Sequence, residues 1–275
     1  SGFYYVKAEN AVYECKARGN LRKAGVSPIV GDSVEITVTS PGLGVLESVY
    51  PRKNQLKRPA VANIDKLIIV SSFSTPAPDT LMIDRLSALA VYSGIKPVIV
   101  FNKCDQGDFS EFHRIYANAG FPVYTVSAET GEGLSALKNE FFGCICAMAG
   151  NSGVGKSSLI NALFGGLELE TGAVSEKLGR GRHTTRHTQL FSVENGGFVA
   201  DTPGFSSVEP DRNYDFKERL AECFPEFAEF SDNCRFGGCS HTCEKGCAVI
   251  RAKSEGKIEP TRFQSYCSLY EEFKS

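Results

Sequence analysis

The chain has 275 residues, of which 42% are hydrophobic and 23% charged, and its formal net charge is −2. These values are typical of a soluble globular protein of about two domains. No apolar run is long enough to cross a bilayer, and the start lacks the basic and apolar segments of a secretory signal. We therefore expect a cytoplasmic protein without membrane association, whose ten cysteines are buried or bind metal rather than forming disulfides.

Residues 1–62 contain short alternating runs rich in Val, Tyr, Thr and Ile, separated by Gly and Pro. The pattern predicts a β-barrel of about five strands, with an OB-fold as first choice and an SH3-like barrel as the alternative. Residues 1–60 hold nine Lys/Arg against five Asp/Glu, a surplus that weakly indicates nucleic acid. The candidate phosphate-facing cations are Arg18, Arg22, Lys23, Arg52, Lys53, Lys57 and Arg58, with Tyr4, Tyr5 or Tyr13 available for base stacking or for the barrel core.

Residues 63–210 alternate apolar runs with segments of helical period. Strands buried on both faces are predicted at 65–73, 96–102, 121–127 and 144–150, and helices at 79–94, 110–120, 133–143 and 157–165. The alternation predicts an α/β unit with a mainly parallel sheet covered by helices on both sides. Residues 211–275 are predicted to form a third, small unit of helices and loops around a cysteine cluster.

The segment 150–157 reads "GNSGVGKS", the pattern of a phosphate-binding loop between a strand and a helix. In such a loop the backbone N–H groups and the helix N-terminus surround nucleotide phosphates. Lys156 is expected to reach the β- and γ-phosphates and to act in catalysis, while the Ser157 hydroxyl ligates Mg²⁺. The candidate phosphate-binding residues are Gly150, Asn151, Ser152, Gly153, Val154, Gly155, Lys156, Ser157 and Ser158.

Two further motifs predict that the nucleotide base is guanine. In "NKCD", which comprises Asn102, Lys103, Cys104 and Asp105, the Asp105 carboxylate can accept two hydrogen bonds from guanine that adenine cannot donate. Asn102 would brace the loop and Lys103 would lie along the base plane. "SAE" begins at Ser127, and the N–H of Ala128 could meet the guanine oxygen.

The motif "DTPG", at 201–204, follows another apolar run. Asp201 is expected to hold Mg²⁺ through water, and the Gly204 N–H to sense the γ-phosphate. Thr184 or Thr185 could complete the magnesium shell, and the spacing does not distinguish them. Many GTPases place a water-orienting Gln directly after this motif, where this chain has Phe205. His183 is the candidate replacement, with a solvent-exposed or phosphate-backbone-binding His as the alternative.

Near the C-terminus, three cysteines and a histidine have the spacing C-x4-C-x-H-x5-C, formed by Cys234, Cys239, His241 and Cys247. Three thiolates and one imidazole suit a closed tetrahedral zinc site with a structural role. Spacing alone does not exclude Cys243 as a ligand. The alternative is a group of unligated cysteines or a disulfide pair.

The base-reading motif precedes the phosphate loop here, whereas the familiar GTPases have the reverse order. Joining the usual ends of the domain and cutting it elsewhere produces this order, because domain termini commonly lie close together. A permuted GTPase between an N-terminal barrel and a cysteine cluster resembles the RsgA family, also called YjeQ or YloQ. The resemblance covers essentially the whole chain and is carried by "NKCD", "SAE", "GNSGVGKSS", "GRHTTRH", "DTPGF" and "CRFGGCSHTCEKGCAV".

The resemblance implies an OB-fold that touches ribosomal RNA and a GTPase that acts in late maturation of the small ribosomal subunit, which stimulates hydrolysis. It implies a zinc-bound C-terminal domain and leaves Cys243 outside the ligand set. It places the switch histidine of the family at His183, and a hydrophobic residue such as Phe205 is ordinary at its position.

We accordingly expect a monomeric GTP hydrolase with one structural Zn²⁺ and with Mg²⁺ accompanying GTP or GDP. Its expected partners are the small ribosomal subunit and its rRNA. The competing hypotheses are a non-catalytic RNA-binding scaffold that reports GTP and a permuted GTPase of the large subunit. The chain order further suggests that switches ordered by GTP could pull on the cysteine unit that follows them.

Overall fold

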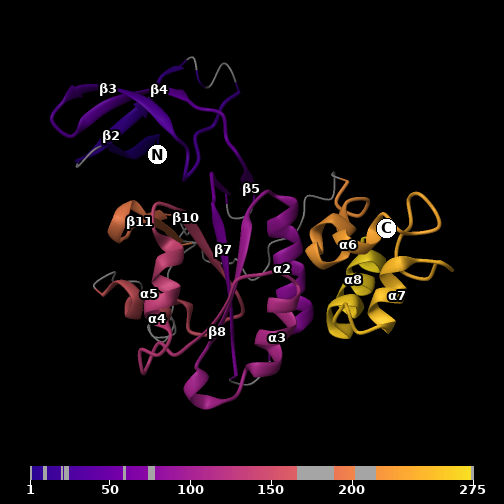
Figure 1. Ribbon diagram of the computed structural model, residues 1–275. Helices are drawn as coiled ribbons and strands as arrows, with labels where there is room; N and C mark the ends of the chain where they lie inside the picture. The colour runs from indigo at the N-terminus through magenta and orange to yellow at the C-terminus, as the bar shows by residue number, and fades with distance from the viewer. Residues whose placement is uncertain are drawn as a thin grey trace, which may run out of the picture.

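The computed structural model describes residues 2–8, 11–19, 21, 25–57, 60–73, 78–165, 189–201 and 215–273. An N-terminal β-sheet, a central sheet with flanking helices and a C-terminal helical unit follow one another along the chain (Figure 1). In Figure 1 the C-terminal unit lies beside α2 (Thr80–Tyr92), and the N-terminal sheet lies above the central sheet. Within the described ranges, none of the helices is both long and apolar enough to cross a membrane.

The N-terminal sheet contains four strands in the order β1-β2-β4-β3. They are β1 (Phe3–Ala8), β2 (Ala11–Ala17), β3 (Val34–Ser40) and β4 (Leu43–Val49). β2 and β4 pair in parallel, and the other two pairs are antiparallel. The sequence predicts about five strands, whereas the described part of this sheet has four. The short β5 (Gln55–Lys57) and β6 (Ala60–Ala62) hydrogen-bond to each other in a separate two-stranded sheet.

The central sheet has six strands in the order β11-β12-β10-β7-β8-β9. They are β7 (Lys66–Ser72), β8 (Lys96–Asn102), β9 (Val123–Val126), β10 (Ile145–Ala149), β11 (Gln189–Ser192) and β12 (Phe198–Asp201). β11 is the single antiparallel strand among them, so the predicted mainly parallel sheet is confirmed. β7 and β8 are almost continuously apolar because both of their faces are covered.

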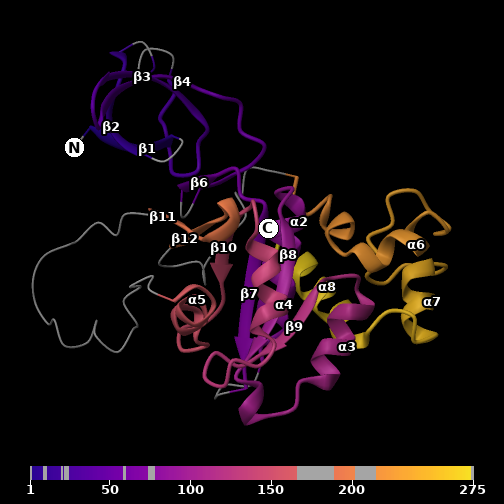
Figure 2. The ribbon, with the colours of Figure 1, turned by 60° about the vertical axis from the view of Figure 1, so that its left-hand side comes forward.

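Helices cover both faces of this sheet, as Figure 2 shows. On one face, Ile69 and Phe101 share a hydrophobic cluster with residues of α2 and α3 (Ser110–Asn118). On the other, Val70 and Val100 cluster with residues of α4 (Leu134–Lys138) and α5 (Lys156–Phe164). Short 3₁₀ helices occupy Cys104–Gln106, Asn139–Phe141 and Glu194–Gly196. The alternation of inward and outward side chains along each strand builds the two separate cores.

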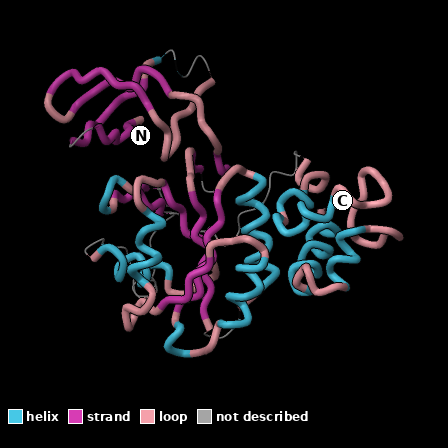
Figure 3. Tube along the Cα trace, in the orientation of Figure 1, coloured by secondary structure: helices cyan, strands magenta, loops and turns pink. Residues whose placement is uncertain are grey.

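The C-terminal unit consists of short helices joined by loops (Figure 3). It contains 3₁₀ helices at Leu220–Cys223 and Pro225–Phe227, followed by α6 (Ala228–Ser231), α7 (Ala248–Ser254) and α8 (Pro260–Glu272). α8 packs against α2, and its buried Tyr266 and Leu269 belong to the same hydrophobic cluster as the α2 side of the sheet. The unit is therefore attached to the central sheet through shared apolar packing.

Candidate nucleotide site and metal centre

Three of the predicted nucleotide-binding segments follow strands that end at one edge of the sheet. β8 ends at Asn102, β9 at Val126 and β10 at Ala149. The parallel register places Asn102 directly opposite Val126, and carboxyl ends of parallel strands meet at the same edge. The loops that begin at residues 103, 127 and 150 are therefore neighbours, although up to about fifty residues separate them in sequence.

The Asn102 side chain joins these three loops. It is 1% exposed. Its Nδ2 donates a hydrogen bond to the Val154 carbonyl oxygen at 2.9 Å, and its Oδ1 accepts one from the Ala128 N–H at 3.1 Å. The Ala128 N–H, which the sequence assigns to the guanine oxygen, thus donates to Asn102 in this structure. A buried amide with both ends paired holds the predicted base-reading and phosphate loops in one arrangement.

Lys103 and Gly155 also lie where Asn102 joins these loops. Lys103 adopts a left-handed backbone conformation with φ of 65°, and its Nζ donates to the Gly153 carbonyl oxygen at 3.0 Å. Gly155 has a φ of 90°, and a Cβ at this position would lie 2.5 Å from Asn102 Nδ2. Glycine is required here by both conformation and space. Asp105 lies in the exposed 3₁₀ turn after β8, where its carboxylate is open to a ligand.

Lys156 is the first residue of α5, and its ammonium group lies inside the phosphate loop. Nζ donates to the carbonyl oxygens of Gly150 at 2.7 Å and Asn151 at 2.8 Å. Burial lowers the pKa of Lys156 below its usual value. An anion bound here would offset that desolvation. The positive end of α5 faces the same loop, so the arrangement suits a phosphate.

The structure describes some of the other predicted site residues and leaves the rest outside its described ranges. Ser157 is half-buried and Ser158 exposed in the first turn of α5. Asp201 is the last residue of β12, and its backbone pairs with that of Gln189 in β11. β12 also pairs with β10, the strand that leads into the phosphate loop. Ser127 is fully buried, and its hydroxyl oxygen accepts a hydrogen bond from the Thr130 N–H at 3.1 Å. His183, Thr184, Thr185 and Gly204, together with Phe205, lie outside the described residues.

The four predicted zinc ligands converge. The ligand atoms of Cys234, Cys239, His241 and Cys247 all lie within 4.8 Å of one another. Cys234 Sγ is 3.8 Å from Cys247 Sγ, and His241 Nδ1 is 3.5 Å and 3.4 Å from these two sulfurs. Tetrahedral zinc with Zn–S of about 2.3 Å and Zn–N of about 2.1 Å separates two sulfurs by about 3.8 Å, and sulfur from nitrogen by about 3.6 Å. The donor set therefore fits a zinc ion.

Burial and hydrogen bonds shift the pKa values of these side chains in opposite directions, and burial raises the pKa of the Cys239 and Cys247 thiols. Burial raises the pKa of the Cys234 thiol, but hydrogen bonds from the N–H groups of Ala248 and Val249, together with the interactions of its sulfur with Cys247 and Cys239, lower the pKa below its usual value. Cys247 caps α7, its sulfur accepting from the Ile250 N–H. Burial lowers the pKa of His241 and so favours the neutral imidazole that binds metal.

Glu244 is a structural residue of the metal loop, residues 234–247, and the sequence analysis missed it. Its carboxylate accepts hydrogen bonds from the N–H and hydroxyl of Ser240 and from the N–H groups of Thr242 and Cys243. Burial alone would raise the pKa of Glu244, but hydrogen bonds from the Ser240 hydroxyl and from the N–H groups of Ser240, Glu244 and Cys243 lower it to about 2. An acidic residue inside the cysteine pattern is the only sequence signal for this role. Cys243 is exposed and lies outside the ligand cluster.

We expect Cys247→Ser to abolish zinc binding and Cys243→Ser to retain it. Serine keeps the capping oxygen at the start of α7 but lacks the thiolate that a structural zinc site needs. Zinc per chain, measured by plasma mass spectrometry on purified protein, should fall from about one to near zero only in the first variant. Loss of zinc from the Cys243→Ser protein would contradict the ligand assignment.

The fold and the loops together define a circularly permuted P-loop GTP-binding protein. The phosphate loop lies between β10 and α5, and the "NKCD" loop that follows β8 precedes it in the chain. Residues 49–211 match the RsgA GTPase family model, and residues 1–46 match that of the RsgA N-terminal domain. The chain belongs to the RsgA family and is a GTP-hydrolysing enzyme.

Individual relatives agree with this assignment over the whole length. The chain is 44% identical to the small ribosomal subunit biogenesis GTPase RsgA of Caldanaerobacter subterraneus subsp. tengcongensis, covering 100% of this chain and 93% of the relative. Identity to the protein of the same name from Geobacillus sp. (strain WCH70) is also 44%, covering 100% and 94%. Among solved structures, YjeQ from Thermotoga maritima matches at 35% identity with a TM-score of 0.85, covering 99% and 95% of the two chains. YloQ, described as a circularly permuted GTPase, matches at 34% identity with a TM-score of 0.83, covering 100% and 92%.

Proposed function

We propose that this GTPase binds GTP across the 102–105, 127–129 and 150–158 segments and acts in late maturation of the small ribosomal subunit. The observation that carries the nucleotide site is the buried Asn102 amide, which joins all three segments through two hydrogen bonds. The names of the relatives, small ribosomal subunit biogenesis GTPases, support the biological role.

In the proposed reaction, water attacks the γ-phosphorus, the bond from this phosphorus to the bridging oxygen breaks, and GDP and inorganic phosphate are released. The Lys156 ammonium and the loop N–H groups stabilise the charge that develops on the phosphate oxygens. Lys156 would exchange its present bonds to the Gly150 and Asn151 carbonyls for phosphate oxygens. Asp105 would select guanine. Ser157 and Asp201 would hold Mg²⁺, which neutralises phosphate charge when bound. His183 as the water-positioning group, Thr184 or Thr185 as a further ligand and Gly204 as the γ-phosphate sensor stay predictions.

The N-terminal sheet is the proposed rRNA-binding surface, and Tyr5 is its best stacking candidate. Tyr5 is 72% exposed, whereas Tyr4 and Tyr13 pack against the small core around Cys15. The alternation along β1 places exposed Phe3 on the same face, and Lys16 lies over the Phe3 ring with 5.1 Å between Nζ and the ring centroid. Exposed aromatics with cations suit base stacking.

Ion pairs within the protein reduce the number of predicted cations that are available to RNA phosphates. Of the predicted set, Arg18 pairs with Glu47, and the half-buried Arg52 pairs with Asp32. Lys53 pairs with Asp65, so three of the predicted positive charges are partly neutralised within the protein. Arg22, Lys23 and Arg58 lie outside the described residues. Lys16, which the sequence analysis did not single out, lies beside the exposed aromatics instead.

We further propose three units, at 1–62, 63–210 and 211–275, in a monomer of the cytoplasm. The first boundary includes the β5–β6 hairpin because Val61 bridges to Val30 of the N-terminal unit. Three units with separate partners, RNA, nucleotide and zinc, would let one chain couple GTP hydrolysis to its position on the subunit.

The test is GTP turnover with purified ribosomal subunits. Addition of small subunits should raise kcat severalfold or more, while large subunits should leave it unchanged. Stimulation by large subunits instead would identify a GTPase of that particle. Absence of turnover with either subunit, despite GTP binding, would indicate a non-catalytic scaffold.

A further inference from the structure

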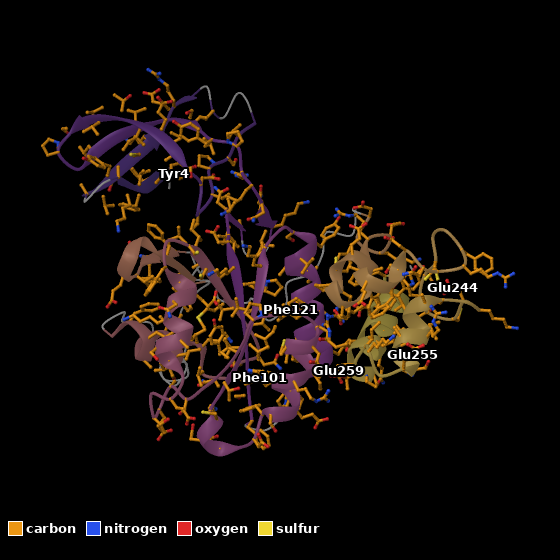
Figure 4. The ribbon with its side chains drawn as sticks, in the orientation of Figure 1. Tyr4, Phe101, Phe121, Glu244, Glu255 and Glu259 are labelled. Carbon is orange, nitrogen blue, oxygen red and sulfur yellow. The ribbon has the colours of Figure 1, made fainter. Side chains whose placement is uncertain are left out.

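The outer side of the metal loop, 234–247, presents an aromatic ring to solvent. Phe236 is 53% exposed although it lies only two residues after a metal ligand. The guanidinium carbon of the adjacent, exposed Arg235 lies 5.4 Å from the centroid of the Phe236 ring. Figure 4 shows that Glu244 of the same loop lies at the outer end of the C-terminal unit, far from Phe101 and Phe121 of the central unit. A single exposed apolar side chain is ordinary on a protein surface, so the inference depends on the setting of this ring in the loop.

Hydrogen bonds hold the backbone next to the Phe236 ring. The Arg235 N–H donates to the Gly246 carbonyl oxygen at 3.2 Å, which ties the two ends of the loop together. Cys234, directly before Arg235, accepts a hydrogen bond from the Ala248 N–H at 3.3 Å. A Cβ added at Gly246 would lie 3.1 Å from the Arg235 side chain, so the two ends of the loop are closely packed. A ligand of Phe236 would therefore meet a surface whose backbone is already ordered.

The approach to the ring is open. Gly237 and Gly238 follow Phe236, and a Cβ built on either would meet nothing within 4 Å. The two glycines thus leave room for a planar group beside the ring. Gly238 also has a φ of 72°, which turns the chain back toward Cys239 and the metal cluster.

The charges of the loop favour an anionic ligand. Its acidic and basic residues are Arg235, Glu244 and Lys245. The Glu244 carboxylate is directed inward and accepts hydrogen bonds from the loop itself. Arg235 and Lys245 are both exposed. An exposed aromatic ring on a loop with two exposed cations matches the composition of surfaces that stack a nucleic-acid base and bind its phosphate.

We propose that Phe236, assisted by Arg235, stacks on an unpaired RNA base. The inference deepens the proposed function and rests on it, since the RNA would belong to the small ribosomal subunit. It assigns a base contact to the zinc unit in addition to the N-terminal sheet. A protein pocket is the less fitting partner, because the neighbours of the ring in the loop are glycines and a cation rather than further apolar side chains.

The absence of tryptophan from this chain allows a direct test. Phe236→Trp introduces a single indole at the proposed contact, and stacking on a base quenches indole fluorescence. Phe142→Trp is the matched control, because Phe142 is also an exposed phenylalanine, 37% exposed, on the loop before β10. The zinc-loaded full chain of each variant is titrated with a 12-nucleotide single-stranded RNA of mixed sequence and with a hairpin of the same composition.

We expect the single strand to quench the indole of the Phe236→Trp protein strongly and the hairpin stem to quench it weakly. Neither RNA should affect the indole of the Phe142→Trp protein. Phe236→Ala should weaken binding of the full chain to small subunits roughly tenfold, and Phe236→Tyr should restore it, because stacking needs a π face.

An unquenched indole in the Phe236→Trp protein, at RNA concentrations up to saturation, would overturn the proposal. Weaker subunit binding by Phe236→Ala together with that unquenched indole would also overturn it and point to a ribosomal protein. Subunit-stimulated GTP turnover is measured separately, so the failure of one proposal is distinguishable from that of the other.

Discussion

Replacement of Lys156 by alanine is expected to lower kcat for GTP hydrolysis by roughly 10²–10³-fold, the loss typical of removing one group that stabilises transition-state charge. The ammonium lies within the phosphate loop, bonded to the carbonyl oxygens of Gly150 and Asn151. Because burial already lowers the pKa of Lys156, its charge is costly without a phosphate. The nucleotide-free variant should therefore unfold at the same temperature as the parent or at a higher one.

The matched control is Lys138→Ala. Lys138 lies on α4 and pairs with the exposed carboxylate of Glu194, a contact that contributes at most about 1 kcal/mol to stability. Single-turnover hydrolysis and GDP affinity are measured for both variants. Equal hydrolysis by the Lys156→Ala and Lys138→Ala proteins would contradict the role assigned to the phosphate-loop lysine.

Replacement of Arg262 by alanine is expected to reduce the free energy of unfolding by about 3–5 kcal/mol, the usual cost of leaving a buried charge unpaired. Arg262, on α8, is 1% exposed. Its guanidinium bonds Asp84 of α2 at 2.7 Å and Glu226 at 2.7 Å and 3.1 Å. It also lies over the Phe224 ring, 4.5 Å from the centroid. The substitution would remove both the counter-charge and the packing that attach the C-terminal unit to the central sheet.

Urea unfolding of Arg262→Ala and Arg85→Ala separates this buried network from an exposed pair between the same two helices. Arg85 of α2 pairs with Glu272 of α8, with both side chains partly exposed, so its loss should cost about 1 kcal/mol or less. The penalty of Arg262→Ala should shrink as the pH falls. Burial raises the pKa of Asp84 even with Arg262 beside it, and loss of Arg262 removes an interaction that lowers this pKa, so the folded variant takes up a proton here at higher pH than the folded parent or the unfolded chain. Equal penalties for the two variants would contradict the structural importance of the buried network.

Asp215 and Phe216 are held against the C-terminal ends of α2 and α8. The Tyr92 hydroxyl at the end of α2 donates to Asp215 at 2.8 Å, and Phe216 is 3% exposed, with its ring centroid 5.0 Å from those of Tyr92 and Phe273. A pull exerted through the "DTPG" segment would therefore act first on this anchor. The hypothesis that GTP alters the grip of the C-terminal unit in this way stays a prediction.

Local spacing predicted the chemical groups of this protein. A phosphate loop, a guanine-reading loop and a zinc ligand set each need particular residues a few positions apart, and the chain supplies them in short segments. The apolar runs likewise predicted the buried strands, because a parallel strand is covered on both faces. The motif order alone indicated the permutation, which the match to YloQ supports.

Only the tertiary structure decided how these groups are held together. Asn102 contacts residues 52 and 26 positions away, and Arg262 pairs with Asp84 across 178 positions. No local period encodes such partners, because they are brought together by packing of whole elements. Tertiary structure also decided that Tyr5 is exposed to solvent, whereas Tyr4 and Tyr13 pack against the core of the N-terminal sheet. Likewise, the path of the loop leaves Cys243 outside the cluster, although it is the same residue type as three of the four residues in the cluster.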